Sequence, residues 1–555
     1  MNLIRPQLPS FDITRWRTLP FTERARAACG AWATDGYGTP MAVYLLYLAK
    51  IGLYIWGWAW LCGFSPSLGS IDQISTWWLD PLALQKAILW SMLFEVLGLG
   101  CGSGPLTGRY LPPVGGLLYF LRPGTVRLPP AQWGPFAGNR RGWVDVGLYA
   151  ALLAVLLAAL LAPVVSTAHM VAVVILIGTL GLRDQTIFLA ARSEHYAVAL
   201  LVYLAAGPSP ADATAGLMGV WAALWFFAGF SKLNHHFPTV VGVMMSNSPM
   251  MQSVALRKRM YRSYPDDLRP SQLATVLGHL GTALELAVPI VLVAATATGS
   301  APLLAVGLLL MLALHVYITA NVPMGVPLEW NVAVVYGALV LFWGSPDVAV
   351  FDASPAVAAL VLSTSVAVPL LGNLFPERVS FLPSMRYYAG NWAMSVWLFR
   401  HDSHEKLRAL PMTAPYIEDQ LAVLFDEDVI TSALSKVVAF RLMHLHGRAL
   451  GLLLPKAIDA PLAEYTWLDG ELVAGMVLGW NFGDGHLHGE ALLDAIRDSC
   501  GFAPGELRVI CVESQPLLQR RHAWQIFDGA EGRIAAGSVD VATLRSRQPW
   551  DLGPA

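Results

Sequence analysis

The stretch WFFAGFSKLN, residues 225–234, decides how the rest of the chain is interpreted. It places a lysine, Lys232, at the end of an otherwise apolar helix. An ammonium group there is costly unless it faces a polar cavity or reaches the membrane interface, so Lys232 is a candidate functional residue. The neighbours of this lysine therefore determine what the protein can do.

The composition identifies the class of protein. Hydrophobic residues make up 55% and charged residues 13% of the 555-residue chain, and the mean hydropathy is +0.52. Both values lie well outside the range of soluble globular proteins and indicate a multi-span membrane protein. A net charge of −2 without a basic tract gives no reason to expect a nucleic-acid partner. The five cysteines lack metal-site spacing, so no metal is expected.

Apolar windows long enough to cross a bilayer, about 20 residues each, recur through the first two thirds of the chain. We predict an α-helical bundle of ten spans, at about 42–63, 83–102, 143–164, 166–183, 185–206, 214–233, 273–297, 301–321, 328–346 and 355–374. The transmembrane domain is thus 42–375, and an N-terminal arm, 1–41, precedes it.

Lysine and arginine gather in alternate loops of this bundle, which predicts that the N-terminal arm and the region after the last span are both cytoplasmic. The weakest part of the prediction is 166–206, because charged residues interrupt its apolar sequence. A single crossing there would invert the orientation of everything that follows.

The chain after the last span has a different composition. Residues 376–404 are aromatic and basic, as an interfacial amphipathic helix would be, and 405–555 are predicted to form a soluble α/β domain of helices and β-hairpins. EYTWLDGELVAGMVLGW, 464–480, has the alternation and Asp-Gly turn of one hairpin, and HAWQIFDGAEGRIAAGSVDV, 522–541, predicts another. No nucleotide-binding or hydrolase motif occurs there, so we expect a lid domain or a docking domain for a protein partner, and not a second active site.

Ionisable side chains inside the predicted spans form the candidate site. Five of them lie in three spans: Glu194, His195, His279, Glu285 and His315. For any single histidine, hydrogen bonding between helices is the better explanation. Lys232, His195 and His315 together favour a cavity instead, in which a desolvated lysine can act as a general base. We expect these three side chains to line one pocket of about 300–1,000 Å³.

The same stretches resemble a known family. LWFFAGFSKLN, 224–234, resembles the lysine-bearing helix of the vitamin K-dependent gamma-glutamyl carboxylases and the wider HTTM (horizontally transferred transmembrane) superfamily. DQTIFLAARSEHYAVALL, 184–201, looks like the family's earlier histidine helix, and LHVYITANVPMGVPLEW, 314–330, like its later one. GNWAMSVWLFRHDSHEKL, 390–407, and QRRHAWQIFD, 519–528, are similar to segments that follow the last span.

The overall size and layout are similar to an actinobacterial transmembrane family without assigned function, which we expect to be a branch of this superfamily. The resemblance implies that Lys232 is the catalytic base, with His195 and His315 as its catalytic histidines. In the carboxylases a neutral lysine deprotonates a reduced quinol, so the resemblance implies menaquinol or another quinol as cofactor. Residues expected to bind it are Glu194, Glu285, His279 and Trp330.

Three functions are open at this point. The first is an integral membrane enzyme that resembles the carboxylases, with Lys232 as general base on a quinol or related lipid-soluble substrate. The second is a non-catalytic membrane protein for lipid handling or complex assembly, with membrane lipids and another protein as partners. The third is a proton-coupled transporter, although the sequence has no obvious inverted repeat. All three place the protein in the bacterial inner membrane.

Overall fold

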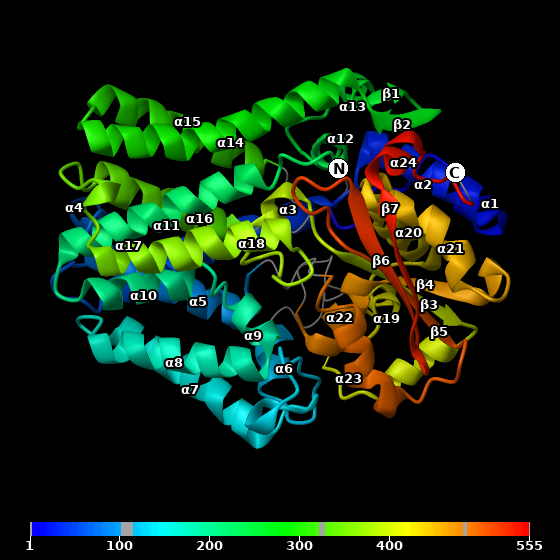
Figure 1. Ribbon diagram of the computed structural model, residues 1–555, viewed down its shortest axis with the longest axis horizontal. Helices are drawn as coiled ribbons and strands as arrows, with labels where there is room; N and C mark the ends of the chain where they lie inside the picture. The colour runs from blue at the N-terminus through cyan, green and yellow to red at the C-terminus, as the bar shows by residue number, and fades with distance from the viewer. Residues whose placement is uncertain (1–2, 101–114, 321–327, 414, 481–484, 554–555) are drawn as a thin grey trace.

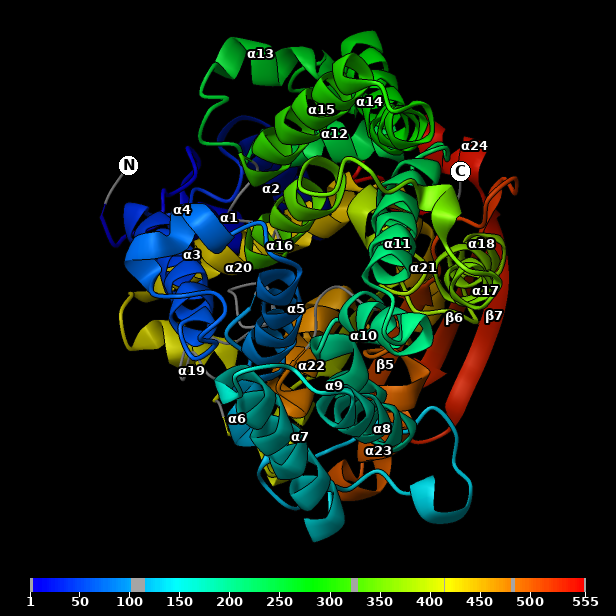
Figure 2. The same cartoon turned by 90° about the vertical axis from the view of Figure 1, so that its left-hand side faces the viewer.

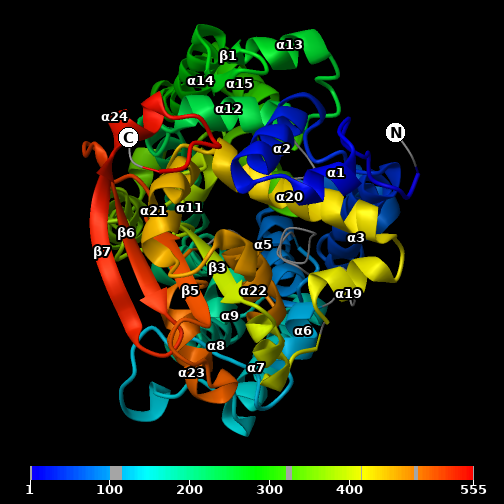
Figure 3. The same ribbon diagram turned by 90° about the vertical axis from the view of Figure 1, so that its right-hand side faces the viewer.

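The computed structural model describes residues 3–100, 115–320, 328–413, 415–480 and 485–553. A bundle of helices that run roughly side by side lies next to a β-sheet with shorter helices around it (Figure 1). Seen along the bundle, α14 and α15 lie at one edge and α7 and α8 at the opposite edge (Figure 2). The N-terminal helices α1 (Ile13–Thr18) and α2 (Phe21–Asp35) lie at the sheet end, beside α20 (Glu427–Met443) (Figure 3).

Among the described residues, six helices are long and apolar enough to cross a membrane. They are α3 (Met41–Cys62), α7 (Trp143–Leu161), α11 (Pro210–Phe230), α14 (Gln272–Thr298), α15 (Ala301–Thr319) and the helix Pro355–Leu374, which joins α17 (Pro355–Val361) to α18 (Val368–Leu374) through a π-helical turn. In its most apolar window α11 is 78% buried, whereas α15 is 22% buried. The lysine-bearing helix α11 is therefore the centre of the bundle, and α15 lies at its periphery.

The prediction of ten spans is not supported. The other four windows form shorter or broken helices, namely α5 (Pro81–Val96), α8 (Thr167–Arg183), α9 (Gln185–Ala190) with α10 (Tyr196–Ala206), and α16 (Leu328–Ala338). Hydropathy does not separate them from spans, because a helix buried inside a bundle is as apolar as one that faces lipid. Asp184 ends α8 and caps α9 through the Thr186 backbone N–H, which fixes one of these breaks. The side of the membrane on which each terminus lies stays a prediction.

A five-stranded antiparallel sheet in the order β4-β3-β5-β6-β7 forms the second layer. Its strands are β3 (Met394–Arg400), β4 (Tyr465–Asp469), β5 (Leu507–Val512), β6 (Arg521–Asp528) and β7 (Gly532–Asp540). The hairpin expected at 522–541 is confirmed as β6 and β7. The remaining elements are α4 (Ile74–Trp77), α6 (Gly115–Phe120), α12 (Phe237–Met245), α13 (Val254–Arg259), β1 (Tyr261–Ser263), β2 (Asp267–Pro270), α19 (Ile417–Ala422), α21 (Leu450–Ala457), α22 (Gly470–Leu478), α23 (Glu490–Cys500) and α24 (Val541–Ser546).

Two predictions about this layer are wrong. Residues 394–400 form the strand β3 with six of seven residues buried, so the aromatic segment is an interior strand and not an interfacial helix. The Asp-Gly pair of 464–480 begins the helix α22 instead of a hairpin turn, because the Asp469 side chain accepts the Glu471 backbone N–H at 2.9 Å as a helix N-cap. Asp-Gly suits both structures, and the sequence does not distinguish them.

The two layers share one hydrophobic core. Trp225 of α11 and Trp397 of β3 belong to the same continuous cluster of buried side chains, and Phe440 of α20 joins it from the sheet side. The domain expected at 405–555 therefore packs on the bundle through its core, and its central strand begins before residue 405.

Removal of the Asp469 carboxylate should destabilise the sheet layer strongly. Arg441 is buried and pairs with Asp469 at 2.5 Å and with Glu471. Asp469→Ala weakens this buried pair and removes the cap of α22, so we expect a loss of about 3–5 kcal/mol in unfolding free energy. As the matched control, Glu405→Ala breaks the half-exposed pair with Arg408 and should cost about 1 kcal/mol or less. Equal losses in denaturant titrations of the two purified variants would contradict this account.

Candidate functional site

The first turn of α16 brings three buried side chains, Glu329, Trp330 and Asn331, toward different parts of the bundle. Asn331 Oδ1 lies 2.8 Å from His315 Nδ1 on α15, and Trp225 Nε1 on α11 donates to His315 Nε2 at 3.0 Å. Because an indole nitrogen can only donate, His315 Nε2 must accept the hydrogen bond from Trp225. The ring proton is therefore on Nδ1, which donates a hydrogen bond to Asn331 Oδ1. His315 is thus a neutral imidazole held between α11 and α16.

His195 lies on the other side of this turn, at the break between α9 and α10. Its ring packs against Trp221 of α11, with centroids 4.4 Å apart, and against Trp330, 6.1 Å away. Neither ring nitrogen has a hydrogen-bond partner among the residues that the structure describes. Since Trp221 and Trp225 are one turn apart on α11, His195 and His315 occupy successive levels of the same central helix.

A buried ion pair accompanies His195. Arg192 Nε and Glu194 Oε1 are 3.1 Å apart, and the Arg192 guanidinium lies 5.5 Å from the Trp330 ring centroid. Arg192 has a φ of 52°, a conformation that a side chain other than glycine rarely adopts and that lets the chain turn between the two helices. The charged residues that interrupt the predicted span therefore form a structured turn inside the bundle.

Two carboxyl groups that lie near this turn are not among the site residues predicted from the sequence. Glu95 of α5 and Glu329 of α16 hydrogen-bond to each other, and both lie against Gly100, where a Cβ atom would collide with them. A hydrogen bond between two carboxyl groups needs a proton on one of them. The signal that could have found this pair is the same rule that singled out the histidines, because a carboxylate inside an apolar window is costly and marks a site.

Lys232 does not join the histidines. Its Nζ pairs with the Glu285 carboxylate of α14 and lies 5.2 Å from the Phe237 ring centroid. Lys232 lies in the turn after α11, two residues beyond its last residue, Phe230, and seven residues after Trp225. Glu285 supplies the counter-charge that a buried ammonium requires.

The predicted site residues therefore separate into two groups and one isolated residue. Glu194, His195, His315 and Trp330 gather around the first turn of α16, as described above. Lys232 and Glu285 form a separate pair. His279 is exposed on the outer face of α14 and belongs to neither group.

An apolar cavity of about 560 Å³ lies between α3, α15 and α16. Its volume falls in the expected range, but of the three predicted catalytic residues only His315 lines it, together with Asn331. Leu48 and Val316 at its rim are 64% and 60% exposed on the outside of the bundle. Exposed apolar side chains of two candidate membrane spans, α3 and α15, therefore border this cavity.

A cluster of four buried histidines lies between the bundle and the sheet. Three have one ring nitrogen held at a backbone carbonyl: His236 at Ala389, His444 at Phe440 and His522 at Glu513. His446 lies between His444 and His522, with ring centroids 5.9 and 6.1 Å away. His236 looked like an interfacial loop residue in the sequence, and the structure buries it. Within the described ranges, no group of three or more histidine, cysteine, aspartate or glutamate side chains has the geometry to hold a metal ion.

The fold and this distribution of polar groups define a helical, multi-span membrane protein with a packed sheet layer. The chain belongs to the family described as a transmembrane protein of unknown function (DUF3556), which matches residues 1–555. This agrees with the expected transmembrane family without assigned function. No curated protein and no solved structure matches the chain. The resemblance to the HTTM superfamily and the carboxylases stays a prediction.

The Lys232–Glu285 pair should behave as a structural unit. Lys232→Met or Glu285→Gln alone leaves a buried charge or dipole without its partner, and we expect each to cost about 3–5 kcal/mol of unfolding free energy. The double variant should recover most of this loss, because it removes both partners. Thermal unfolding of the four proteins in one detergent measures the coupling. Intact stability of Lys232→Met would contradict the structural role and favour a lysine that works as a base.

Acidification should destabilise the interface between bundle and sheet. Burial lowers the pKa of His236 to about 3 and that of His522 to about 4, below the ordinary value of about 6.5. The unfolded chain therefore binds protons that the folded protein does not, and stability that is complete above pH ~6.5 is lost as the pH falls toward 4.

His522→Gln should flatten the slope of the unfolding midpoint against pH over this window. His401→Gln, at a side chain that is 67% exposed, is the matched control and should keep the slope of the unchanged protein. Identical slopes in all three proteins would rule out His522 as a source of the pH dependence.

Proposed function

We propose that this membrane protein binds a lipid-soluble molecule in the cavity between α3, α15 and α16, and that its function is lipid handling. The observation that carries the proposal is a cavity of about 560 Å³ whose rim is exposed to the lipid side and whose wall contains the buried His315–Asn331 pair. Ligand sites are typically apolar pockets of this size with few polar groups, and the bilayer supplies apolar ligands directly.

The buried pair of His315 and Asn331 forms a rigid part of the cavity wall. His315 is held from both sides, by Trp225 at 3.0 Å and by Asn331 at 2.8 Å, so its ring cannot rotate without the loss of two buried hydrogen bonds. A quinol or another lipid with a long apolar chain suits such a lining, because the chain exchanges lipid contacts for contacts to aliphatic and aromatic side chains. Both environments are apolar, so the binding free energy comes from close packing in the fixed shape and from the polar groups.

An enzyme that acts on the same lipid-soluble molecule is the second candidate. The supporting observation is the group of ionisable side chains at the first turn of α16, where the Glu95–Glu329 pair shares a proton one residue away from Trp330. Such a pair can give or take a proton at a buried site. The carboxylase-like mechanism with Lys232 as base would require its pair with Glu285 to open and the ligand to reach the far end of α11.

A bulky side chain inside the cavity should prevent binding. Val335 lines the cavity from α16, so Val335→Trp fills space that the ligand needs. We expect wild-type protein purified in nanodiscs to carry a specific lipid, found by extraction and mass spectrometry, and the variant to lose about tenfold of it or more, equivalent to 1.4 kcal/mol. Ile290→Trp, on α14 at a side chain that is 59% exposed, is the matched control and should keep the lipid.

Equal lipid content in wild type and Val335→Trp would overturn the proposal. Glu329→Gln separates the two candidates, because it should retain the lipid in both cases but abolish turnover if the protein is an enzyme.

A further inference from the structure

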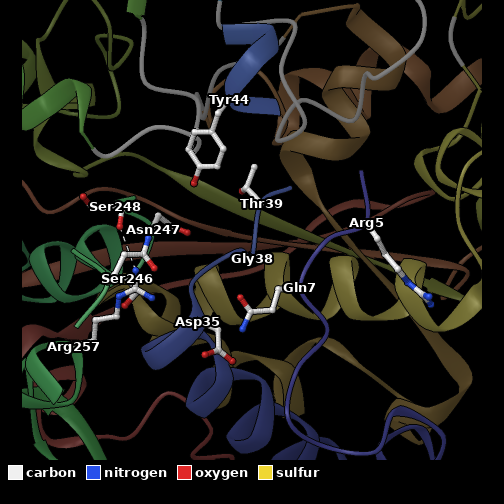
Figure 4. Close-up of a pocket in the computed structure, with 11 residues that line it drawn as sticks. Arg5, Gln7, Asp35, Gly38, Thr39, Tyr44, Ser246, Asn247, Ser248 and Arg257 are labelled. Carbon is white, nitrogen blue, oxygen red and sulfur yellow. Dashed lines mark hydrogen bonds between the residues drawn. The ribbon is translucent and has the colours of Figure 1, made fainter. Parts of the chain in front are cut away.

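A small polar pocket adjoins the apolar cavity at the sheet end of the bundle (Figure 4). Figure 4 shows Gln7 of the N-terminal arm and side chains from the end of α2, the turn after it, the start of α3, the loop after α12 and α13 around the pocket, whereas Arg5 points away. The cavity volume is about 60 Å³, several times the roughly 10–15 Å³ that one water molecule needs. A single phosphate-sized group fits a space of this size.

Tyr44 connects the two hollows, because it lines both of them. The loop after α12 continues this connection, since Ser248 lines the polar pocket while the next residues, Pro249 and Met250, line the apolar cavity. A molecule with an apolar chain in the cavity would thus present its polar end to this pocket.

The walls of the pocket are fixed by buried hydrogen bonds. Arg257 donates to the backbone carbonyls of Thr34 at 2.6 Å, Met251 at 2.8 Å and Ser248 at 3.2 Å, and so ties the end of α2 to the loop after α12. These bonds use three of its five N–H groups. A guanidinium that is 7% exposed and already oriented is a suitable partner for an anion.

One buried donor in the pocket has no partner. Thr39 is 7% exposed, and its hydroxyl forms no hydrogen bond to any residue that the structure describes. An unsatisfied buried hydroxyl costs about 1–3 kcal/mol, which a ligand oxygen would recover. The figure places the Thr39 side chain between Tyr44 and Gln7, at the centre of the group.

The charge around the pocket favours an anion. Arg5 and Arg257 line it against one carboxylate, Asp35, and Lys436 lies directly behind, where its Nζ donates to the Gln7 and Tyr37 carbonyls at 2.6 and 2.9 Å. The Arg5 guanidinium points away from the other labelled side chains in Figure 4 and pairs with the exposed carboxylate of Asp426, the N-cap of α20. Without Arg5, the cations Arg257 and Lys436 still exceed the one pocket carboxylate, Asp35.

We infer that the polar pocket binds the phosphate of an anionic membrane lipid whose apolar chain lies in the adjoining cavity, with Thr39 and Arg257 as its hydrogen-bond donors. The inference rests on the proposed lipid-handling function for the chain and narrows the ligand from any lipid-soluble molecule to one with a phosphate. A quinol head has no negative charge to offer this site. Phospholipids and polyprenyl phosphates share the chemistry that the pocket would recognise.

The test loads the delipidated full-length protein in detergent with lipids of matched chains. Dioleoyl phosphatidic acid and dioleoylglycerol differ only in the phosphate, and native mass spectrometry measures how much of each is retained. We expect the protein to prefer the phosphatidic acid by about tenfold or more. Thr39→Val, a substitution of similar shape, and Arg257→Gln should each reduce this preference severalfold and leave dioleoylglycerol retention unchanged.

Other results would separate the two proposals. Equal retention of both lipids, lost in both cases with Val335→Trp, would overturn the phosphate site and leave the lipid cavity standing. Retention of neither lipid would overturn the lipid-handling function itself. Thermal stabilisation by inorganic phosphate alone, without retention of phosphatidic acid, would assign the pocket to free phosphate and overturn the lipid source. If Arg257→Gln fails to fold, Thr39→Val decides the outcome.

Discussion

Polar groups that lie inside a bilayer must find their partners within the protein, because the hydrocarbon core offers none. In this chain the first turn of α16 meets much of that requirement. Asn331 holds His315, Trp330 covers Arg192 and His195, and Glu329 holds the carboxyl of α5. Three consecutive residues thus connect α16 to three other parts of the bundle. The central helix α11 supplies the indole rings that pack between these groups.

This constraint explains why the bundle contains short and broken helices. The break between α9 and α10 places Arg192, Glu194 and His195 at the level of the α16 turn, whereas a continuous span would carry them past it. The same argument applies to Lys232, which lies in the turn after α11 and has its counter-charge, Glu285, on α14. The two polar centres are separate, and the apolar cavity lies beside the first of them. Lipid binding therefore needs no movement of the lysine, whereas chemistry by the lysine does.

Much of this arrangement could be predicted from the sequence. Composition gives the membrane class, and helical windows give α3, α7, α11, α14 and α15 to within about four residues at each end. The cost of a buried polar group singled out Glu194, His195 and His315, which the structure places inside the bundle around the first turn of α16. Strand alternation gave the β6–β7 hairpin.

The rest depends on tertiary contacts that a single sequence does not show. Hydropathy counts α5, α8 and α16 as spans, because burial against other helices and burial in lipid select the same residues. Asp469 and Gly470 begin a helix because a buried Arg441 lies beside the carboxylate. Lys232 and Glu285 are 53 residues apart, and only the packing of α11 on α14 brings them together. The polar pocket joins three distant segments, 5–7, 35–44 and 246–257, none of which has a recognisable motif.

The most direct test of the central claim is an electron cryomicroscopy map of the protein in nanodiscs made with lipids from its native membrane. The account predicts an elongated density between α3, α15 and α16 that passes His315 and ends near Tyr44. A map in which side chains of α3 and α15 close this cavity, with ligand density at Lys232 instead, would contradict it.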